Sequence, residues 1–204
     1  MIYVPAAFAE PSEANLYALM RRHPFATLIA PAGGKVEVSH LPLLADEGVG
    51  ILRGHLARAN PQWRGFSQDR EIIAVFHGPH HYISPAWYGT HPSVSTWNYA
   101  VVHAHGVPRL IDDPGELERM LAELTQIHES GMSSPWKMDL PRDYMDAMLK
   151  GIVGFEIRVT RLEGKFKLSQ NRPSTDRPRV VAALEALAND DALGIAALMQ
   201  ERDR

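Results

Sequence analysis

Short apolar or alternating segments, separated by turn residues, recur along most of the chain and constrain its fold more than any other feature. Apolar and polar residues alternate in 35–40 and 152–162, as in strands with one buried face. Segment 71–77 is almost entirely apolar, as expected of a central strand. Turn sequences such as 31–34 and 46–48 separate these segments. The pattern predicts about six strands, most of them joined by hairpins, in an antiparallel sheet.

Helical patterns are concentrated away from the strands. Apolar residues at helical spacing, with capping residues and stop signals, predict helices at 12–23, 112–129, 144–149, 178–188 and 191–201. Helices segregated in this way indicate an α+β fold, and the many short apolar strands favour a small barrel. We expect one domain at 1–175 and a helical appendage at 176–204 that packs on it. Gly106-Val107-Pro108 predicts a bulge or an edge strand, because proline cannot donate to a ladder.

Composition excludes several classes of protein. With 204 residues, of which 45% are hydrophobic, the chain can bury one sizeable core. Its net charge of -3 argues against a protein that mainly coats nucleic acid. It contains no cysteine, so disulfides, Fe–S clusters and thiolate catalysis are excluded. Neither a signal peptide nor an apolar run of membrane-spanning length is visible, and we expect a cytoplasmic protein that does not contact membranes.

A basic segment near the C-terminus is the first candidate binding site. Between Arg161 and Arg179, Lys and Arg outnumber Asp and Glu by six to two. Lys167, Gln170 and Asn171 combine positive charge with amide donors and acceptors, which suits an anionic ligand that also carries a ring. The alternative is a basic loop that simply faces water.

Arg58 and the segment Trp97-Asn98 supply two further candidates. Arg58 follows a predicted strand and precedes the helix start at Asn60-Pro61, where a guanidinium and backbone N–H groups can hold a phosphate. An exposed arginine with no ligand is the alternative. Trp97 and Asn98 offer a stacking surface beside an amide, although aromatic core packing explains them equally well.

Histidines raise the question of a metal site. Six of the ten lie between His77 and His105, and His103 and His105 would share one face of a strand. However, Asp and Glu are absent from 75–111, so hydrogen-bonding histidines are favoured and no metal ligand is assigned. Haem remains an alternative ligand for this cluster.

Six motifs follow one another along almost the whole chain: Tyr3-Val4-Pro5-x-x-Phe8, Ser39-His40-Leu41-Pro42, Gly54-His55-Leu56-Ala57-Arg58-Ala59-Asn60-Pro61-Gln62, Gly78-Pro79-x-x-Tyr82-Ile83-Ser84-Pro85-x-Trp87-Tyr88, Thr96-Trp97-Asn98-Tyr99-x-x-Val102-His103 and Glu163-Gly164-Lys165-x-Lys167-Leu168-Ser169-Gln170-Asn171. Together they resemble the PaiB family of FMN-binding proteins, which are described as negative transcriptional regulators. The resemblance implies the antiparallel, six-stranded split β-barrel of pyridoxamine-phosphate oxidases, with peripheral and C-terminal helices. It also implies a homodimer with two flavin sites at the subunit interface.

The resemblance assigns roles to eight residues. It implies that the FMN phosphate is held by His55 and Arg58, and that the flavin ring is lined by Thr96, Trp97 and Asn98. It further implies that the site is closed, from the same subunit or the partner, by Lys167, Gln170 and Asn171. In one respect the chain departs from the best-known split-barrel enzymes, whose phosphate site often pairs Arg with Lys: position 57 is alanine.

These observations predict an FMN-binding dimeric regulator. No catalytic residue is assigned, since the chain shows neither an activated nucleophile nor a pair of carboxylates placed for acid–base chemistry. An FMN-dependent oxidoreductase or flavin reductase is the alternative, and a haem-binding split-barrel protein is a further one. DNA is a candidate partner, yet Ala192 to Met199 contains no Lys or Arg to read a groove.

Overall fold

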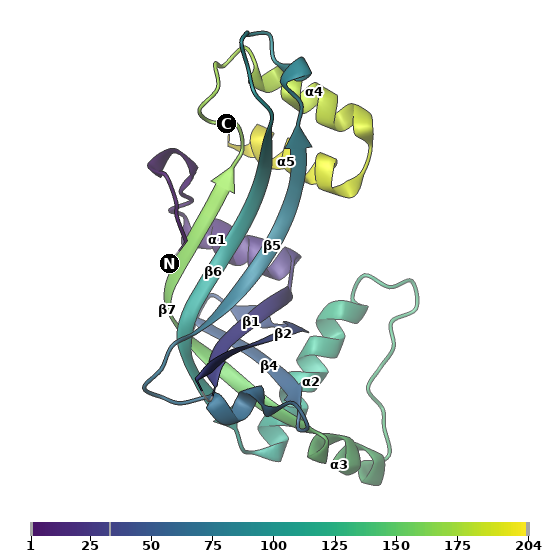
Figure 1. Ribbon diagram of the computed structural model, residues 1–204. Coiled ribbons are helices and arrows are strands. Elements are labelled where there is room, and N and C mark those ends of the chain that lie inside the picture. Colours follow the sequence, from purple (N-terminus) through teal and green to yellow (C-terminus); the bar gives the residue numbers. More distant parts are fainter. Residues whose placement is uncertain (1, 33, 203–204) are drawn as a thin grey trace. The chain divides into compact units, whose positions relative to one another are not determined.

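The computed structural model describes residues 2–32 and 34–202, and Figure 1 shows its elements. Within these residues one sheet contains seven strands: β1 (Phe25–Ala32), β2 (Lys35–Pro42), β3 (Leu44–Asp46), β4 (Ile51–Ala57), β5 (Ile72–Ile83), β6 (Thr96–Ile111) and β7 (Ile152–Lys167). The described helices are α1 (Glu13–Arg22), α2 (Pro114–Glu129), α3 (Arg142–Lys150), α4 (Arg177–Leu187) and α5 (Asp190–Glu201), with the 3-10 turns η1 (Ala6–Phe8), η2 (Pro61–Gly65) and η3 (Pro85–Trp87).

The strand order is β2-β1-β5-β6-β7-β4-β3, so the fold is α+β with one sheet, as predicted. The predicted number of six strands is wrong. The additional strand, β3, has three residues, which is too short for an alternating pattern to reveal it. Within the described residues, none of the helices combines the length and apolar character needed to cross a membrane.

The expectation of an edge strand at Gly106-Val107-Pro108 is also wrong, and the alternative of a bulge there stays a prediction. These residues lie inside β6, which has β5 on one side and β7 on the other. Gly106 and Pro108 are buried. Strand β5 continues to Ile83, beyond the strand predicted at 71–77, and η3 follows it. Pairing with strands on both sides therefore overrides the local preference of Gly and Pro for the edge of a sheet.

The chain divides into two compact units. Unit 1 comprises Met1–His23, Phe76–His103 and Leu162–Arg204, and unit 2 comprises Pro24–Val75 and Ala104–Arg161. Strands β5, β6 and β7 contribute residues to both units. The division predicted at residue 175 stays a prediction.

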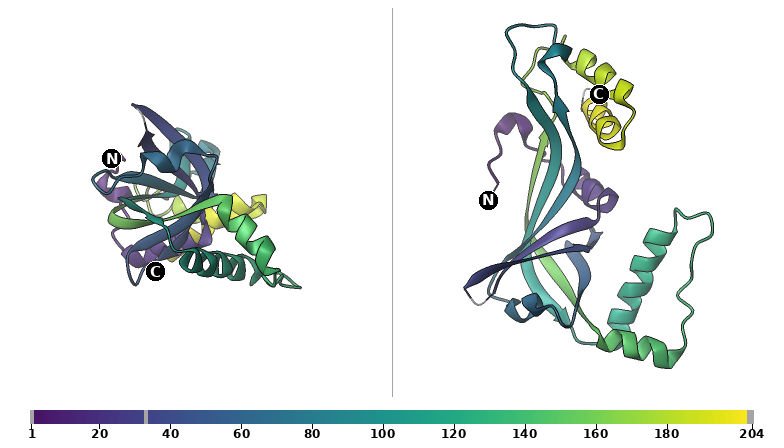
Figure 2. Two further views of the ribbon diagram at one scale, coloured as in Figure 1. Left: turned by 90° about the horizontal axis from the view of Figure 1, so that it is seen from below. Right: turned by 45° about the vertical axis from the view of Figure 1, so that its right-hand side comes forward.

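Unit 2 is built on strand pairs whose register is regular. Strands β1 and β2 form a hairpin, from Phe25 opposite Pro42 onward, and β4 pairs with β7 from Ile51 opposite Arg158 onward. Helices α2 and α3 follow one another with a loop between them (Figure 2). They bury an apolar cluster made of Leu44, Ile111, Leu117, Met120, Leu124, Met145 and Leu149. Gln62 is fully buried, and its amide nitrogen donates to Leu28 O and Glu37 O at 3.2 and 3.0 Å.

Unit 1 contains α1 and the hairpin of α4 and α5 (Figure 1). The Ser12 hydroxyl caps α1 by accepting from Asn15 N at 3.4 Å. Asn189 caps α5 by accepting from Ala192 N at 2.9 Å, after Ala188 ends α4 in a left-handed conformation. These caps confirm the helices predicted near 12–23, 178–188 and 191–201.

Candidate functional site

The eight residues predicted to bind the cofactor fall in both units. His55 and Arg58 belong to unit 2, and the other six belong to unit 1: Thr96, Trp97, Asn98, Lys167, Gln170 and Asn171. Four of these six line one cavity of about 210 Å³, which we call the Lys167 cavity. Its lining consists of Tyr88, Val94, Ser95, Thr96, Asn98, Lys167, Ser169, Asn171 and Arg172.

Lys167 is held at the end of β7 by groups from the start of β6. Its ammonium donates to the Thr96 hydroxyl and, at 2.7 Å, to Trp97 O. The side chain is half-buried. Burial, and to a lesser extent the charge of Lys165, lowers the pKa of Lys167 from its ordinary value. This contact is consistent with the prediction that Lys167 and Thr96 lie at the same site.

Asn98 and Ser169 form the buried floor of the cavity. Asn98 is 0% exposed, and its amide nitrogen donates to Ser169 Oγ at 3.0 Å and lies 3.6 Å from Met199 Sδ. Ser169 has a φ of 62°, a left-handed conformation that is uncommon for residues other than glycine. The Asn98 amide thus joins β6 to the turn after β7 and to α5.

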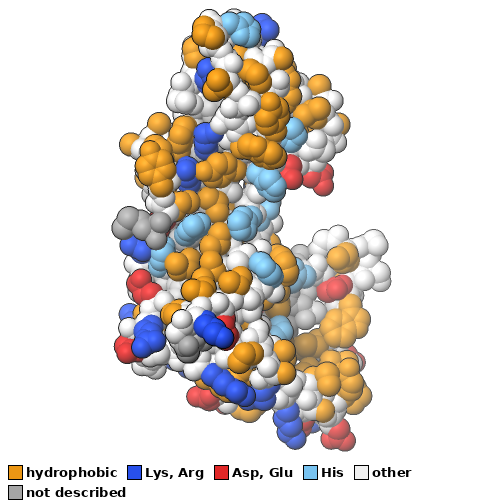
Figure 3. Space-filling model, viewed as in Figure 1, with side chains coloured by type: hydrophobic (Ala, Val, Ile, Leu, Met, Phe, Trp, Pro, Cys, Tyr) orange, Lys and Arg blue, Asp and Glu red, His pale blue; other side chains and the backbone are white. Residues whose placement is uncertain are grey.

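Gln170 and Trp97 lie near the cavity without lining it. The Gln170 side chain closes its own turn: Oε1 accepts from Leu168 N at 2.6 Å, and Nε2 donates to Phe166 O. Trp97 is 53% exposed, and its ring centroid lies 6.3 Å from that of His80 and 6.2 Å from that of Tyr82. Figure 3 shows exposed hydrophobic side chains beside Lys and Arg side chains on the molecular surface. Trp97 and Tyr82 are therefore available for stacking.

Sequence reasoning missed Tyr88, Arg172 and Ser169 as members of the site. The Arg172 guanidinium carbon lies 3.8 Å from the centroid of the Tyr88 ring. Arg172 belonged to the basic segment between Arg161 and Arg179, and Tyr88 to an aromatic motif, so both signals were present in the sequence. Their stacking joins residues far apart in the chain, which no local pattern reveals.

Arg58 and His55 occupy a different environment in unit 2. The Arg58 guanidinium donates from Nε to Lys150 O at 2.8 Å and from Nη2 to Ile152 O at 2.7 Å. Arg58 also lines a cavity of about 380 Å³ together with Trp63, Asp146 and Lys150. His55 Nδ1 is buried without a hydrogen-bond partner among the described residues, and burial lowers the pKa of the ring. Their assignment to the phosphate stays a prediction.

The helix start that supported a phosphate site near Arg58 is short. η2 is a 3-10 turn of five residues, and the Asn60 side chain already accepts from Gln62 N at 3.0 Å. His103 and His105 belong to units 1 and 2 respectively, and the expectation of hydrogen-bonding histidines there, with haem as the alternative ligand, stays a prediction.

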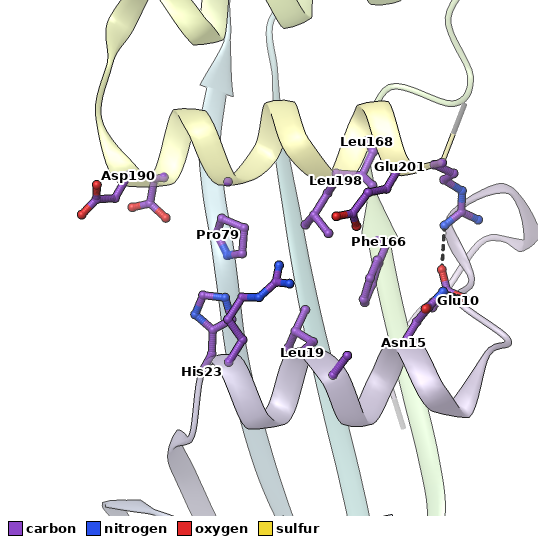
Figure 4. Close-up of a pocket in the computed structure, with 15 residues that line it drawn as sticks. Glu10, Asn15, Leu19, His23, Pro79, Phe166, Leu168, Asp190, Leu198 and Glu201 are labelled. Atoms are coloured by element: carbon purple, nitrogen blue, oxygen red, sulfur yellow. Dashed lines mark hydrogen bonds and ion pairs between the residues drawn. The ribbon is translucent and has the colours of Figure 1, made fainter. Parts of the chain in front are cut away.

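The largest cavity described in unit 1, about 510 Å³, lies between α1 and α5 and contains none of the eight predicted residues. Figure 4 shows Leu19 on α1 and Leu198 on α5 facing one another across it. An ion pair between Arg202 and Glu10, with a nitrogen–oxygen distance of 3.1 Å, lies at one end. This cavity is lined by Asp190, Asp191 and Glu201 as well as by apolar residues.

Asp176 anchors the loop beside the Lys167 cavity and predicts a dependence of stability on pH. Its buried carboxylate accepts from Thr90 Oγ1 at 2.5 Å and from Gly89 N at 2.8 Å. The Thr90 hydroxyl bond, followed by the backbone bonds of Gly89 and Thr90 and the charge of Arg172, holds the pKa of Asp176 below its usual value against the opposing effect of burial. The carboxyl group of Asp176 therefore keeps its charge at lower pH in the folded protein than in the unfolded chain. The contribution of this charge to the stability of the folded protein is present above about pH 4 and is lost as the pH falls through the folded pKa.

We expect Asp176→Asn to lower the thermal unfolding midpoint at pH 7, and we expect this difference from wild type to shrink below about pH 4. Thermal unfolding followed by circular dichroism between pH 7 and pH 3 measures both effects. Thr90→Val, which removes the hydroxyl donor and keeps the Gly89 bond, should show a smaller form of the same pH dependence. A difference that does not change with pH would contradict the role of the Asp176 charge.

Comparisons with known proteins agree with this fold. Residues 2–161 match the family model "Putative FMN-binding domain". The chain is 34% identical to protease synthase and sporulation protein PAI 2 of Bacillus subtilis, over 98% of each chain. It is 32% identical to an uncharacterized protein of Emericella nidulans, over 98% of this chain and 97% of that one.

Two solved structures share the fold at low sequence identity. The flavocytochrome Anf3 from Azotobacter vinelandii aligns with a TM-score of 0.62 and 11% identity, over 78% of this chain and 69% of that one. The FAD and haem binding protein from Mycobacterium smegmatis aligns with a TM-score of 0.61 and 14% identity, over 78% and 73% of the two chains. At these identities the likeness establishes the fold.

Proposed function

The chain belongs to the family of FMN-binding domains that its residues 2–161 match, and from this membership we propose that it binds FMN as a homodimer and acts as a regulator of the PaiB type. The observation that carries the proposal is the Lys167 cavity. It gathers two cations, four hydroxyl-bearing side chains and two amides from segments far apart in the chain. FMN offers an anionic phosphate and a ring edge with hydrogen-bonding groups, which such a lining suits.

The size of the cavity supports the dimer. At about 210 Å³ it is smaller than the roughly 300 Å³ at which sites for drug-sized ligands begin. The cavity can therefore hold one part of FMN, and we propose that the rest lies against a second subunit in a split β-barrel dimer. Trp97 and Tyr82, which are 53% and 42% exposed, provide aromatic surface for the ring or for the partner.

We propose that regulation does not use α4 and α5 to read DNA. α5 carries no Lys or Arg between Asp190 and Glu201. In α4, Arg177 donates to Leu168 O and Met199 O at 3.4 and 3.3 Å, and Arg179 donates to Trp87 O at 3.3 Å. Base reading needs cationic or amide side chains that are available to the groove. We propose instead that regulation acts through a change in the dimer when the flavin is bound or reduced.

Following the resemblance, Arg58→Ala should weaken FMN binding by about 1.5 to 3 kcal/mol, the value of a charge-assisted hydrogen bond. Titration of the apoprotein with FMN, followed by flavin fluorescence, measures this. Arg64→Ala is the matched control, since Arg64 is an exposed arginine of the same unit that contacts the Trp63 ring. Because Arg58 also donates to Lys150 O and Ile152 O, the unfolding midpoints of both variants are compared with wild type.

Two outcomes would overturn parts of the proposal. Wild-type protein that does not bind FMN at high micromolar concentration would refute flavin binding. Equal affinity in wild type and Arg58→Ala, with the fold intact, would refute only the assignment of Arg58 to the phosphate. Anaerobic mixing of the FMN complex with NADH or NADPH separates the two classes of function, because rapid bleaching of the flavin would identify an oxidoreductase in place of a regulator.

A further inference from the structure

The Lys167 cavity differs in charge from the two other cavities described above. Among the described residues that line it, Lys167 and Arg172 are charged and no carboxylate is present. The cavity between α1 and α5 is lined by several acids, and the cavity beside Arg58 is lined by Asp112 and Asp146. The Lys167 cavity therefore has an excess of positive charge that its own lining does not neutralise.

Both cations keep donors that a ligand can use. An ammonium has three N–H donors, and Lys167 directs two contacts to Thr96 Oγ1 and Trp97 O, which leaves one. Arg172 stacks on the Tyr88 ring, and its hydrogen bond from Nη2 to Val94 O is long at 3.5 Å. Stacking fixes the plane of a guanidinium, whose paired N–H groups then match the two oxygens of a phosphate or carboxylate.

The hydroxyl of Tyr88, a residue that lines the cavity, lacks a hydrogen-bond partner among the described residues. Tyr88 is 1% exposed, and its OH is buried without a partner among the described residues. Buried polar atoms in native proteins are nearly always paired, with protein, water or ligand. Ser169, whose hydroxyl bonds Asn98, holds an uncommon left-handed backbone conformation at the same cavity. Residues in such conformations cluster at ligand sites.

We infer that the Lys167 cavity is an oxyanion site, which binds a phosphate or carboxylate group through Arg172 and Lys167. The cationic fork of Arg172 would meet two oxygens, and the exposed Ser95 and Asn171 side chains add neutral donors at the rim. Two sources can supply this group: the phosphate of FMN itself, in which case Arg58 does not hold that phosphate, or an anionic ligand that binds beside the flavin. Only the first source rests on the proposed function.

Inorganic phosphate is the probe, added to the full-length apoprotein and measured by isothermal titration calorimetry at constant ionic strength. We expect wild-type protein to bind phosphate and Arg172→Gln to weaken that binding by about tenfold or more, as loss of a charge-assisted contact requires. Arg179→Gln is the matched control, since Arg179 is an exposed arginine of unit 1 that does not line the cavity, and it should bind like wild type.

Arg172→Gln also removes the packing of Arg172 on Tyr88, so a second variant that leaves this packing in place is needed. Asn171→Asp keeps the size of an exposed side chain and adds a negative charge at the rim, so it too should weaken phosphate binding. The inference is overturned if wild-type protein does not bind phosphate, or if both folded variants bind it as well as Arg179→Gln does.

Comparing FMN with riboflavin, which lacks the phosphate, identifies the source of the oxyanion. If Arg172→Gln weakens FMN binding and leaves riboflavin binding unchanged, the cavity holds the FMN phosphate. If saturating FMN leaves phosphate affinity unchanged, the cavity serves a second anionic ligand. Failure to bind either flavin would refute the proposed function, while the phosphate titration still decides the oxyanion site.

Discussion

Phe155→Ala is expected to lower the free energy of unfolding by about 3 to 5 kcal/mol, the usual cost of truncating a fully buried phenylalanine. Phe155 is 0% exposed in β7, lies opposite Gly54 of β4, and contacts the Phe66 ring edge-on at a centroid distance of 5.2 Å. Glycine opposite Phe155 offers no side chain that could fill the vacated volume. Urea denaturation followed by circular dichroism measures the loss.

Phe25→Ala provides the control for this prediction. Phe25 is also in a strand of unit 2, but 65% of it is exposed, so its truncation should cost far less. Equal losses for the two variants would show that unit 2 does not have its core at Phe155. A loss for Phe155→Ala below about 1 kcal/mol would lead to the same conclusion.

Alternation made the position of Phe155 predictable from sequence. From Val153 to Val159 every second residue is apolar, and the structure buries Val153, Phe155 and Ile157 as that pattern requires. The hairpin of β1 and β2 and the helices α1, α4 and α5 were predicted in the same way, from periodicity and capping residues. Such signals are local, so the sequence alone carries them.

Strand neighbours were less predictable, because they depend on contacts between distant residues. Local sequence around Pro108 favours an edge, yet β6 lies between β5 and β7. The three-residue β3 exists through its pairing with β4, from Leu44 opposite Arg53 to Asp46 opposite Ile51. Neither feature has a periodic signature in the chain.

At the site, the resemblance to a family's motifs predicted which residues lie together better than the chemistry of single residues did. It placed Thr96, Asn98, Lys167 and Asn171 together, and the structure brings these four to one cavity. It could not reveal Arg172 on Tyr88, since stacking depends on the turn that follows β7. Nor could it reveal the use of the Gln170 amide within that turn. The local geometry of turns thus limits what motif order can predict.

Gly106→Ala is expected to destabilise the protein by at least about 3 kcal/mol, at the upper end of the costs of overpacking a core. A Cβ atom at this position would lie 2.4 Å from Arg158 O and 2.6 Å from Ile157 Cγ2. Arg158 pairs with Ile51 of β4, so its carbonyl cannot retreat without disturbing that pairing. The position therefore requires glycine because β7 approaches the backbone of β6 closely.

Gly131→Ala is the matched control, because a Cβ atom at Gly131 would meet no atom within 4 Å. Its unfolding free energy should stay within about 0.5 kcal/mol of wild type. Chemical denaturation of both variants, under the same conditions, measures the contrast. A Gly106→Ala protein as stable as Gly131→Ala would mean that β6 and β7 are farther apart at this point, as at the edge or bulge that the sequence around Pro108 favours. A large loss confined to Gly106→Ala would instead establish that β6 is a central strand whose glycine allows β7 to pair closely against it.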